Sequence, residues 1–230
     1  MREAYKIQVH DKDNPDKYHY LDYAINIEKG GKLKGDNDDN VIVGTLGDDK
    51  IIGKGGDDIQ HGDDVSKTAW IAGDDKLYGG KGHDTLYGYR GNDKLYGGLG
   101  NDYLHGGAGA DIFVLSEIIV RNPGIRDTGI QIRDIVDDFD IGVDKVRVQQ
   151  EWIDKGWVNI SVNHEAEFDE YDLIVQFKMQ FEEDEKLPNK ITIGSQIKLG
   201  YLSSGDMAAY YAAGGTLGVA EADNILLDIV

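Results

Sequence analysis

The chain has 230 residues, 31 of them glycine, and its 43 aspartates and glutamates outnumber 24 lysines and arginines to give a formal net charge of −19. This length is enough to bury a core, as one large or two small domains. The charge argues against nucleic acid as a partner, because no basic stripe is evident that could neutralise phosphates. The lack of cysteine excludes disulfides and thiolate chemistry. The sequence also contains no run of about 18 apolar residues, the length that a membrane-spanning helix needs.

The first segment, residues 1–34, contains two strand-like runs, 4–9 and 18–27, on either side of the turn DKDNPDK. Three aspartates take the first, third and twelfth places of an EF-hand loop: Asp11, Asp13 and Asp22. Pro15, and Asp16 where such a loop requires glycine, favour a solvated hairpin turn instead. We expect this segment to cap the first coil of the repeat that follows, whose strand edges would otherwise be exposed.

Residues 35–114 form an internal repeat with a period of nine. The units read GDNDDNVIV, GTLGDDKII, GKGGDDIQH, an interrupted unit that opens at Gly62 and closes AGDDKLY, then GGKGHDTLY, GYRGNDKLY, GGLGNDYLH and GGAGADIFV. Glycine takes the first and often the second and fourth positions, aspartate the sixth, and an apolar residue the eighth. Because side chains alternate along a strand, the eighth positions should form a thin core: Ile42, Ile51, Gln60, Leu77, Leu86, Leu95, Leu104 and Phe113.

The polar positions of the repeat predict cation binding. Glycines at fixed positions let the first six residues form a turn whose carbonyl groups point at one centre. The sixth position adds side-chain oxygens from Asn40, Asp49, Asp58, Asp75, Asp84, Asp93, Asp102 and Asp111. Oxygen ligands without sulfur or imidazole select calcium over transition metals. Since fifteen aspartates face only seven lysines and arginines between residues 36 and 111, we expect the calcium-free repeat to be largely unfolded.

Some outward-facing positions leave a binding role open. Tyrosines recur on both sides of the repeat, at Tyr78, Tyr87, Tyr96 and Tyr103. They could stack on sugars, although aromatic cross-strand ladders also commonly stabilise sheets. Three histidines have no cysteine or converging carboxylate beside them in the pattern, so we expect surface residues rather than zinc ligands: His61, His83 and His105. The fourth unit contains the extra residues DVSKTAWI, which predict a loop bearing Trp70.

After Val114 the period of nine is lost and the pattern alternates in twos. The strings IQIRDIVDDFD, DKVRVQQ, WVNISVN, DLIVQFKMQF and KITIGSQIKL predict an antiparallel sheet over the far end of the repeat. One of its faces should carry Leu173, Val175, Phe177, Met179 and Phe181. Only residues 203–215 predict a helix, with Ser203 and Asp206 as a capping box and Gly214 as the C-terminal stop.

The nonapeptide repeat resembles the RTX, or haemolysin-type, calcium-binding repeat, whose sequence pattern is well known. The string GGAGADIFVLS followed by VDDFDIGVDKV is also similar to the segment that closes the repeat in C-terminal modules of type I secreted proteins. The resemblance implies an all-β fold: a right-handed parallel β-roll of about eight nonapeptide repeats at 35–114. N-terminal strands at 1–34 and a C-terminal antiparallel β region with one short helix at 115–230 would cap it.

The resemblance also implies where calcium lies. In the family each ion sits between turns two units apart, with main-chain carbonyls of the first to fourth positions and both sixth-position side chains as ligands. Up to about six ions are implied, and the insertion in the fourth unit affects two of them. The implied ligands are Asn40, Gly44, Leu46, Gly47, Asp49, Gly53, Gly55, Gly56, Asp58, Asp75, Gly79, Gly80, Lys81, Gly82, Asp84, Gly88, Arg90, Gly91, Asp93, Gly97, Gly98, Leu99, Gly100, Asp102, Gly106, Ala108 and Asp111.

Two departures from the family pattern carry their own expectations. Asn40 replaces the sixth-position aspartate of the first unit and should be a weaker terminal ligand. Gln60 replaces an apolar residue, and we expect a local shift that turns Ile59 inward in its place.

By resemblance, the chain is expected to be a non-catalytic module of a larger protein that is secreted or displayed at the cell surface. It would stay unfolded in the low-calcium cytosol, pass through an ABC-type exporter that reads the C-terminal sequence DNILLDIV, and fold outside together with passenger domains upstream. A glycan-binding module of a large adhesin is the alternative. An enzyme is less expected, because the H-E-x-x-H, G-x-S-x-G and phosphate-loop motifs are missing.

Overall fold

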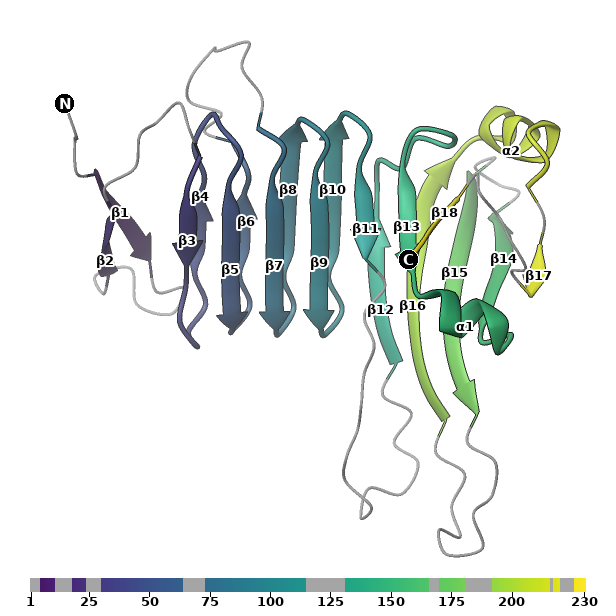
Figure 1. Cartoon of the computed structure of the whole chain (residues 1–230), viewed down its shortest axis with the longest axis horizontal. Helices are drawn as coiled ribbons and strands as arrows, with labels where there is room; N and C mark the ends of the chain where they lie inside the picture. The colour runs from purple at the N-terminus through teal and green to yellow at the C-terminus, as the bar shows by residue number, and fades with distance from the viewer. Residues whose placement is uncertain are drawn as a thin grey trace, which may run out of the picture.

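Two sheets make up most of the molecule, and the strands of each follow one another along its long axis (Figure 1). The structure, a computed structural model, describes residues 5–10, 18–23, 30–63, 73–114, 131–165, 170–180, 192–215, 217–219 and 226–230. In the repeat, the chain alternates between the sheets, and each strand pairs in parallel with the strand two units away, as in the register Lys50↔Lys76↔Lys94. Two nonapeptides therefore make one coil of a β-roll, as the repeat predicted.

The seven-stranded sheet has the order β18-β13-β11-β9-β7-β5-β3. Its strands are β3 (Lys32–Lys34), β5 (Lys50–Gly55), β7 (Lys76–Lys81), β9 (Lys94–Leu99), β11 (Ile112–Val114), β13 (Lys145–Val148) and β18 (Leu227–Ile229). The nine-stranded sheet has the order β17-β14-β15-β16-β12-β10-β8-β6-β4. Its strands are β4 (Val41–Val43), β6 (Ile59–His61), β8 (Thr85–Arg90), β10 (Tyr103–Ala108), β12 (Gln131–Val136), β14 (Val158–Glu165), β15 (Glu170–Gln180), β16 (Thr192–Leu202) and β17 (Gly218–Val219).

All eight inward positions predicted from the repeat are confirmed, since each of these side chains is fully buried. The expected shift at Gln60 is wrong: Gln60 is fully buried and Ile59 is 39% exposed. The parallel pairing Ile42↔Gln60↔Leu86 fixes the register, and a shift would break these backbone hydrogen bonds. The amide Nε2 of Gln60 instead donates a hydrogen bond of 2.7 Å to the carbonyl oxygen of Tyr78, which offsets part of the cost of burying it.

The parallel stacking extends beyond residues 35 and 114. At one end β3 pairs with β5 and buries Leu33. At the other end β12 pairs with β10 and β13 with β11, so that Val136 and Val146 continue the two inward files. The prediction of an antiparallel region is therefore wrong for β12 and β13, and correct for β14, β15 and β16. Alternation in twos shows that a strand has one buried face, but not the direction of its neighbour.

The predicted helix is confirmed as α2 (Ser204–Ala212), with a capping box between Ser203 and Asp206. The backbone of Gly214 has φ of 97°, the left-handed conformation that ends helices. A second, short helix, α1 (Gln150–Asp154), was not predicted; it follows β13 and buries Trp152.

Several predictions are only partly within the described residues. Leu173 and Val175 are buried on β15 as expected, whereas the structure does not describe the side chains of Phe177 and Met179 or residue Phe181. The N-terminal runs form the antiparallel hairpin of β1 (Tyr5–His10) and β2 (Tyr18–Tyr23), beside the first coil in Figure 1. The turn at 11–17 and the loop at 64–72 with Trp70 lie outside the described residues.

Candidate metal centres

The sixth-position aspartates form two ladders along the edges of the roll. In each, one carboxylate oxygen accepts a hydrogen bond from the main-chain N–H of the sixth-position residue two units earlier; between Asp58 N–H and Asp84 Oδ1 the distance is 2.8 Å. One ladder runs through Asn40, Asp58, Asp84, Asp102 and Asp134. The other runs through Gly31, Asp49, Asp75, Asp93, Asp111 and Asp144. The period of nine thus brings together carboxylates of turns that are far apart in sequence.

The second oxygen of most of these carboxylates is buried and has no hydrogen-bond partner among the described residues. This holds for the Oδ2 atoms of Asp58, Asp75, Asp84, Asp93, Asp102, Asp111 and Asp134. Leaving a buried carboxylate oxygen unpaired is costly. So regular a series of unpaired acceptors indicates that a ligand of positive charge completes them.

The space beside these oxygens, apart from that of Asp134, is kept open by the first-position glycine of the same unit. A Cβ atom at Gly88 would lie 2.3 Å from Asp93 Oδ2 and 2.6 Å from the carbonyl oxygen of Gly106, which begins the turn two units later. The arrangement recurs with Gly79, Asp84 and the carbonyl of Gly97. Carboxylate and carbonyl oxygens from turns two units apart therefore converge on one point. Such hard oxygen donors suit calcium.

Electrostatics support the same conclusion. Burial is the main cause that raises the pKa of the carboxyl groups of Asp58 and Asp75 to about 8 and that of Asp93 to about 9; neighbouring aspartates raise them further. Burial likewise raises the pKa of Asp84 and Asp111 to about 7. At neutral pH, folding must either protonate these groups or bury their negative charge. A bound divalent cation removes that conflict.

The two N-terminal members of the ladders differ from the others. Asn40 uses its Oδ1 to accept a hydrogen bond of 2.8 Å from the N–H of Asp36, within its own turn. Both the N–H and the hydroxyl of Thr45 donate to Oδ2 of Asp49, at 2.6 and 2.8 Å. The oxygens of these two side chains are thus already engaged, and the strongest candidate sites lie further along the roll, from Asp58 onward.

The remaining ligands implied by the resemblance would bind calcium through their main-chain carbonyl groups. The second and fourth positions stack directly on the same positions two units away, so that a Cβ atom at Gly98 would lie 2.2 Å from the carbonyl oxygen of Gly80. Lys54 and Tyr89 take the second position with φ of 92° and 77°, which is unfavourable for residues other than glycine. The third-position side chains Leu99 and Lys81 are exposed. The ligand roles of these carbonyls remain predictions.

Sequence reasoning missed three aspartates that lie in or beside the ladders. Asp134 is fully buried, and burial raises its pKa well above its ordinary value; Asp102 adds to the effect. Asp144 continues the other ladder, but its Oδ2 accepts from the N–H of Asp140, so that both its oxygens are engaged. Asp63, in the interrupted unit, has a buried Oδ1 without a partner among the described residues. The signal for the first two was present: Asp134 and Asp144 stand two residues before an inward valine, as each sixth-position aspartate stands two before its core residue.

A pair of glycines in one turn tests the geometry. A Cβ atom at Gly53 would lie 2.1 Å from Asp58 Oδ2, whereas at Gly55 the nearest atom would be 3.5 Å away. We therefore expect Gly53→Ala to raise the calcium concentration at the folding midpoint at least tenfold, because the methyl group fills the site between the oxygens. Gly55→Ala, the matched control, should leave the midpoint nearly unchanged. Calcium titrations followed by circular dichroism would measure both, and equal midpoints would contradict the proposed location.

The comparison with protein families agrees with this assignment. The model of the RTX calcium-binding nonapeptide repeat matches four copies, in residues 34–64, 72–104 and 87–115. No curated protein sequence matches the chain. Two solution structures from the mannuronan C5-epimerase of Azotobacter vinelandii are similar at 23% identity each. The AlgE6R3 subunit is matched over 85% of this chain and 88% of its own length with a TM-score of 0.35. The AlgE6R2 subunit is matched over 72% and 89% with a TM-score of 0.33. Residues 34–64 and 72–115 of this chain thus match the RTX calcium-binding nonapeptide repeat.

Proposed function

We propose that the chain is a calcium-dependent folding and secretion module of a larger type I secreted protein, with no catalytic role of its own. The observation that supports it best is the series of buried, unpaired carboxylate oxygens. A chain with this many buried like charges cannot fold stably where calcium is scarce, and it gains its folding free energy where calcium is plentiful. Export as an unfolded chain followed by folding outside uses that difference.

The C-terminal residues are part of the folded sheet. The strand β18 pairs in parallel with β13, the side chains of Leu226 and Leu227 are buried, and Arg147 forms an ion pair of 2.5 Å with Asp228. In our proposal the exporter reads this segment before folding, when β13 has not yet formed and the apolar side chains are accessible. The helices in the described part of the chain are too short and too polar to cross a bilayer.

Secretion of a fusion protein tests this role. A reporter domain placed before the chain should reach the medium of cells that carry a type I exporter. Removal of residues 226–230 should retain it in the cells. A truncated fusion that is exported as well as the intact one would overturn the signal. Folding of the purified fusion in calcium, measured separately, distinguishes a lost signal from a lost fold.

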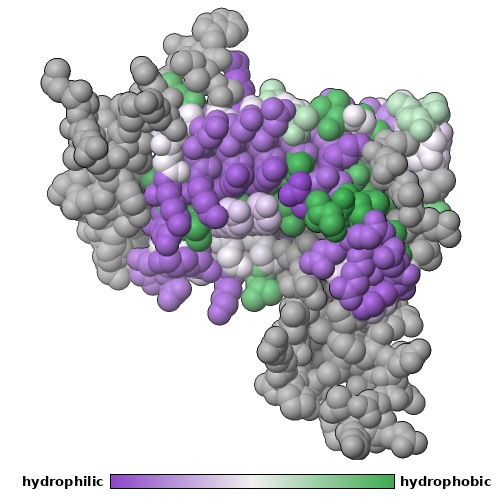
Figure 2. Space-filling view, viewed as in Figure 1, coloured by the Kyte–Doolittle hydropathy of each residue, from purple (hydrophilic) through white to green (hydrophobic). Residues whose placement is uncertain are grey.

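A glycan-binding role is a second candidate, supported by the outer face of the seven-stranded sheet. The rings of Tyr78 and Tyr96 stack there with centroids 4.3 Å apart and an angle of 11°. They border a groove of about 820 Å³ with Lys50, Lys76 and Lys94. Figure 2 shows a hydrophilic band over the beginnings of β5, β7 and β9 and a paler band below it. The two rings cover each other on one side, and Nζ of Lys50 lies over the ring of Tyr78, 4.5 Å from its centre. The ring edges and hydroxyl groups, beside the lysines, are the parts that a sugar would contact.

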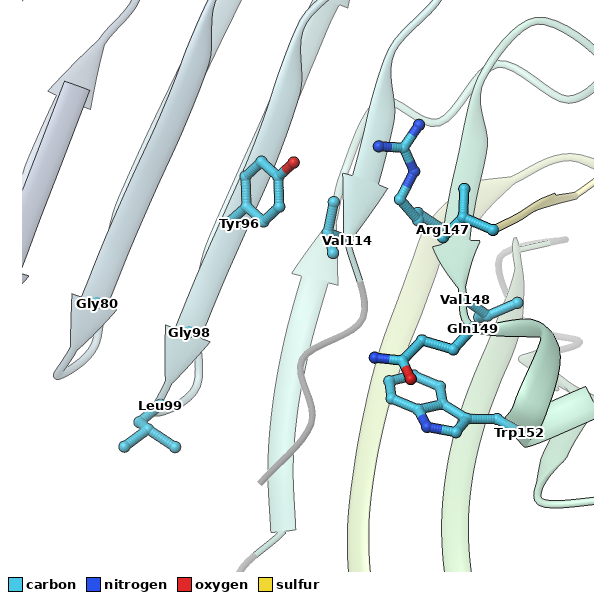
Figure 3. Close-up of a pocket in the computed structure, with 10 residues that line it drawn as sticks. Gly80, Tyr96, Gly98, Leu99, Val114, Arg147, Val148, Gln149 and Trp152 are labelled. Carbon is cyan, nitrogen blue, oxygen red and sulfur yellow. The ribbon is translucent and has the colours of Figure 1, made fainter. Parts of the chain in front are cut away.

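The groove adjoins a smaller cavity of about 390 Å³ between β9 and β13, which Tyr96 also lines (Figure 3). Val114 also lines it and lies between Tyr96 and Arg147 in Figure 3, and Trp152 lines it on the side of Arg147. Titration with a panel of oligosaccharides would test the face. Binding that is lost in Tyr96→Ala and kept in Tyr211→Ala, a change on an exposed residue of α2, would favour this function.

A further inference from the structure

A cluster on the opposite face of the roll shares no residue with the calcium ladders, although Asp138 lies close enough to raise the pKa of Asp111. It comprises His105 on β10 and two aspartates that directly follow β12, Asp137 and Asp138. The parallel register Leu104↔Val136 places His105 beside Asp137. The expectation that His105 lacks a converging carboxylate is therefore wrong, because the loss of the repeat between the two strands conceals the pairing.

The three side chains converge closely. Nδ1 of His105 lies 2.8 Å from Oδ1 of Asp137 and 3.4 Å from Oδ2 of Asp138. One ligand atom from each residue lies within 4.8 Å of the others. The side chains are partly buried, with the imidazole 34% and both carboxylates 19% exposed.

Neighbouring groups hold these side chains in place. The hydroxyl of Tyr103 donates a hydrogen bond to Oδ2 of Asp137. The main-chain N–H groups of Gly106 and Gly107 donate to Asp138, at 3.0 and 2.6 Å. The bond from Gly107 is to Oδ2 of Asp138, the oxygen that faces His105, so it fixes the position of that oxygen directly. Hydrogen bonds to ligating carboxylates orient them at metal sites.

The donor set selects a different metal from the calcium ladders. An imidazole nitrogen with two carboxylate oxygens suits zinc, whereas calcium takes oxygen ligands. Tetrahedral ligation at about 2.0–2.2 Å sets ligand atoms about 3.3 Å apart, and the distances of 2.8 and 3.4 Å need only small adjustments. The two main-chain N–H groups hold Asp138 beside the ion pair of His105 and Asp137, so that a second carboxylate faces the same imidazole.

We propose that His105, Asp137 and Asp138 bind one Zn²⁺ ion, with the fourth position open to water or an external ligand. The ion joins β10 to β12 and so bridges the point at which the nonapeptide repeat ends. Because these strands are adjacent only in the folded roll, the zinc site forms only after calcium has folded the chain.

The test uses the full chain in millimolar calcium, so that the calcium sites are filled. Titration calorimetry with Zn²⁺ should show one tight site per chain, and Co²⁺ in its place should give the visible absorption of a low-symmetry complex. His105→Asn should abolish both signals. Tyr103→Phe, which removes the hydrogen bond to Asp137, should weaken Zn²⁺ binding roughly 10–100-fold.

His61→Asn is the matched control, since His61 faces outward on the same sheet and its Nδ1 contacts the hydroxyl of Tyr89 rather than a carboxylate. It should leave the Zn²⁺ affinity unchanged. Absence of a stoichiometric site in the calcium-loaded protein, or equal affinity in His105→Asn, would overturn the proposal. Circular dichroism in calcium reports folding separately, so either result leaves the calcium-dependent function as a distinct question.

Discussion

Withdrawal of calcium is expected to unfold the roll. The purified chain in strong chelator should lose most of its β signal in far-ultraviolet circular dichroism, and millimolar calcium should restore it. The reason lies in the core: eight buried carboxylates in the described part of the chain each leave an oxygen without a hydrogen-bond partner, while the apolar interior between the sheets is only one side chain per unit thick. Hydrophobic burial alone cannot offset the cost of burying eight such carboxylates and of ordering the glycine-rich turns.

The magnitude of the effect follows from linkage. An ion present at 100 times its dissociation constant stabilises the folded state by about 2.7 kcal/mol per site. Even four occupied sites would supply about 11 kcal/mol, which equals the whole stability of an ordinary domain of about 5–15 kcal/mol. Removal of the ions therefore leaves no net stability.

Magnesium provides the control for this experiment. It demands short, nearly octahedral ligation and keeps its own water molecules, so it should not restore the fold at concentrations at which calcium does. A chain with the same spectrum and melting temperature in chelator as in calcium would contradict both the sites and the function proposed from them.

The repeat was the part of the fold that sequence reasoning could predict. A period of nine fixes the inward position of every unit, and the burial of Leu86, Leu95 and Leu104 follows from it directly. It even holds Gln60 inward against the preference of its side chain, because the register is set by backbone pairing along the whole sheet. The capping box at Ser203 was equally predictable, because it depends on residues three positions apart.

What the sequence did not reveal depends on contacts between distant segments. Asp134 and Asp144 belong to the ladders. Because the period of nine is lost after Val114, neither aspartate could be assigned to a sixth position from the sequence. The same break hides the pairing of β10 with β12, and with it the carboxylates beside His105. Which side chains meet in this region depends on which strand pairs with the last strand of the repeat. The local alternation of apolar residues does not indicate that pairing.

Acidification is expected to have opposite effects on the calcium-free and the calcium-loaded protein. In the calcium-free fold, burial raises the pKa of Asp93 from 3.8 to about 9 and that of Asp58 from 3.8 to about 8. Between these values the folded state binds more protons than the unfolded state, so stability falls as the pH rises, by up to about 1.4 kcal/mol per pH unit for each group. Below about pH 4 both states are protonated and the penalty disappears.

Protons should therefore substitute in part for calcium. Calcium-free protein, prepared by desalting because chelators weaken in acid, should gain β structure and melting temperature as the pH is lowered from 8 to about 4.5. Calcium-loaded protein should show the reverse, a rising calcium midpoint, because the ion must displace protons from its carboxylate ligands. Thermal melts at the two pH values, with and without calcium, measure both trends.

Asp93→Asn separates the two effects in one residue. An amide carries no charge, so this variant should give the calcium-free protein more β signal at pH 8 and reduce the pH dependence of that signal. The same change removes a carboxylate from a site, so it should raise the calcium midpoint. A variant with less β signal than the unchanged chain at pH 8 in the absence of calcium would show that the fold already compensates the charge of Asp93. The carboxylates would then not need a cation.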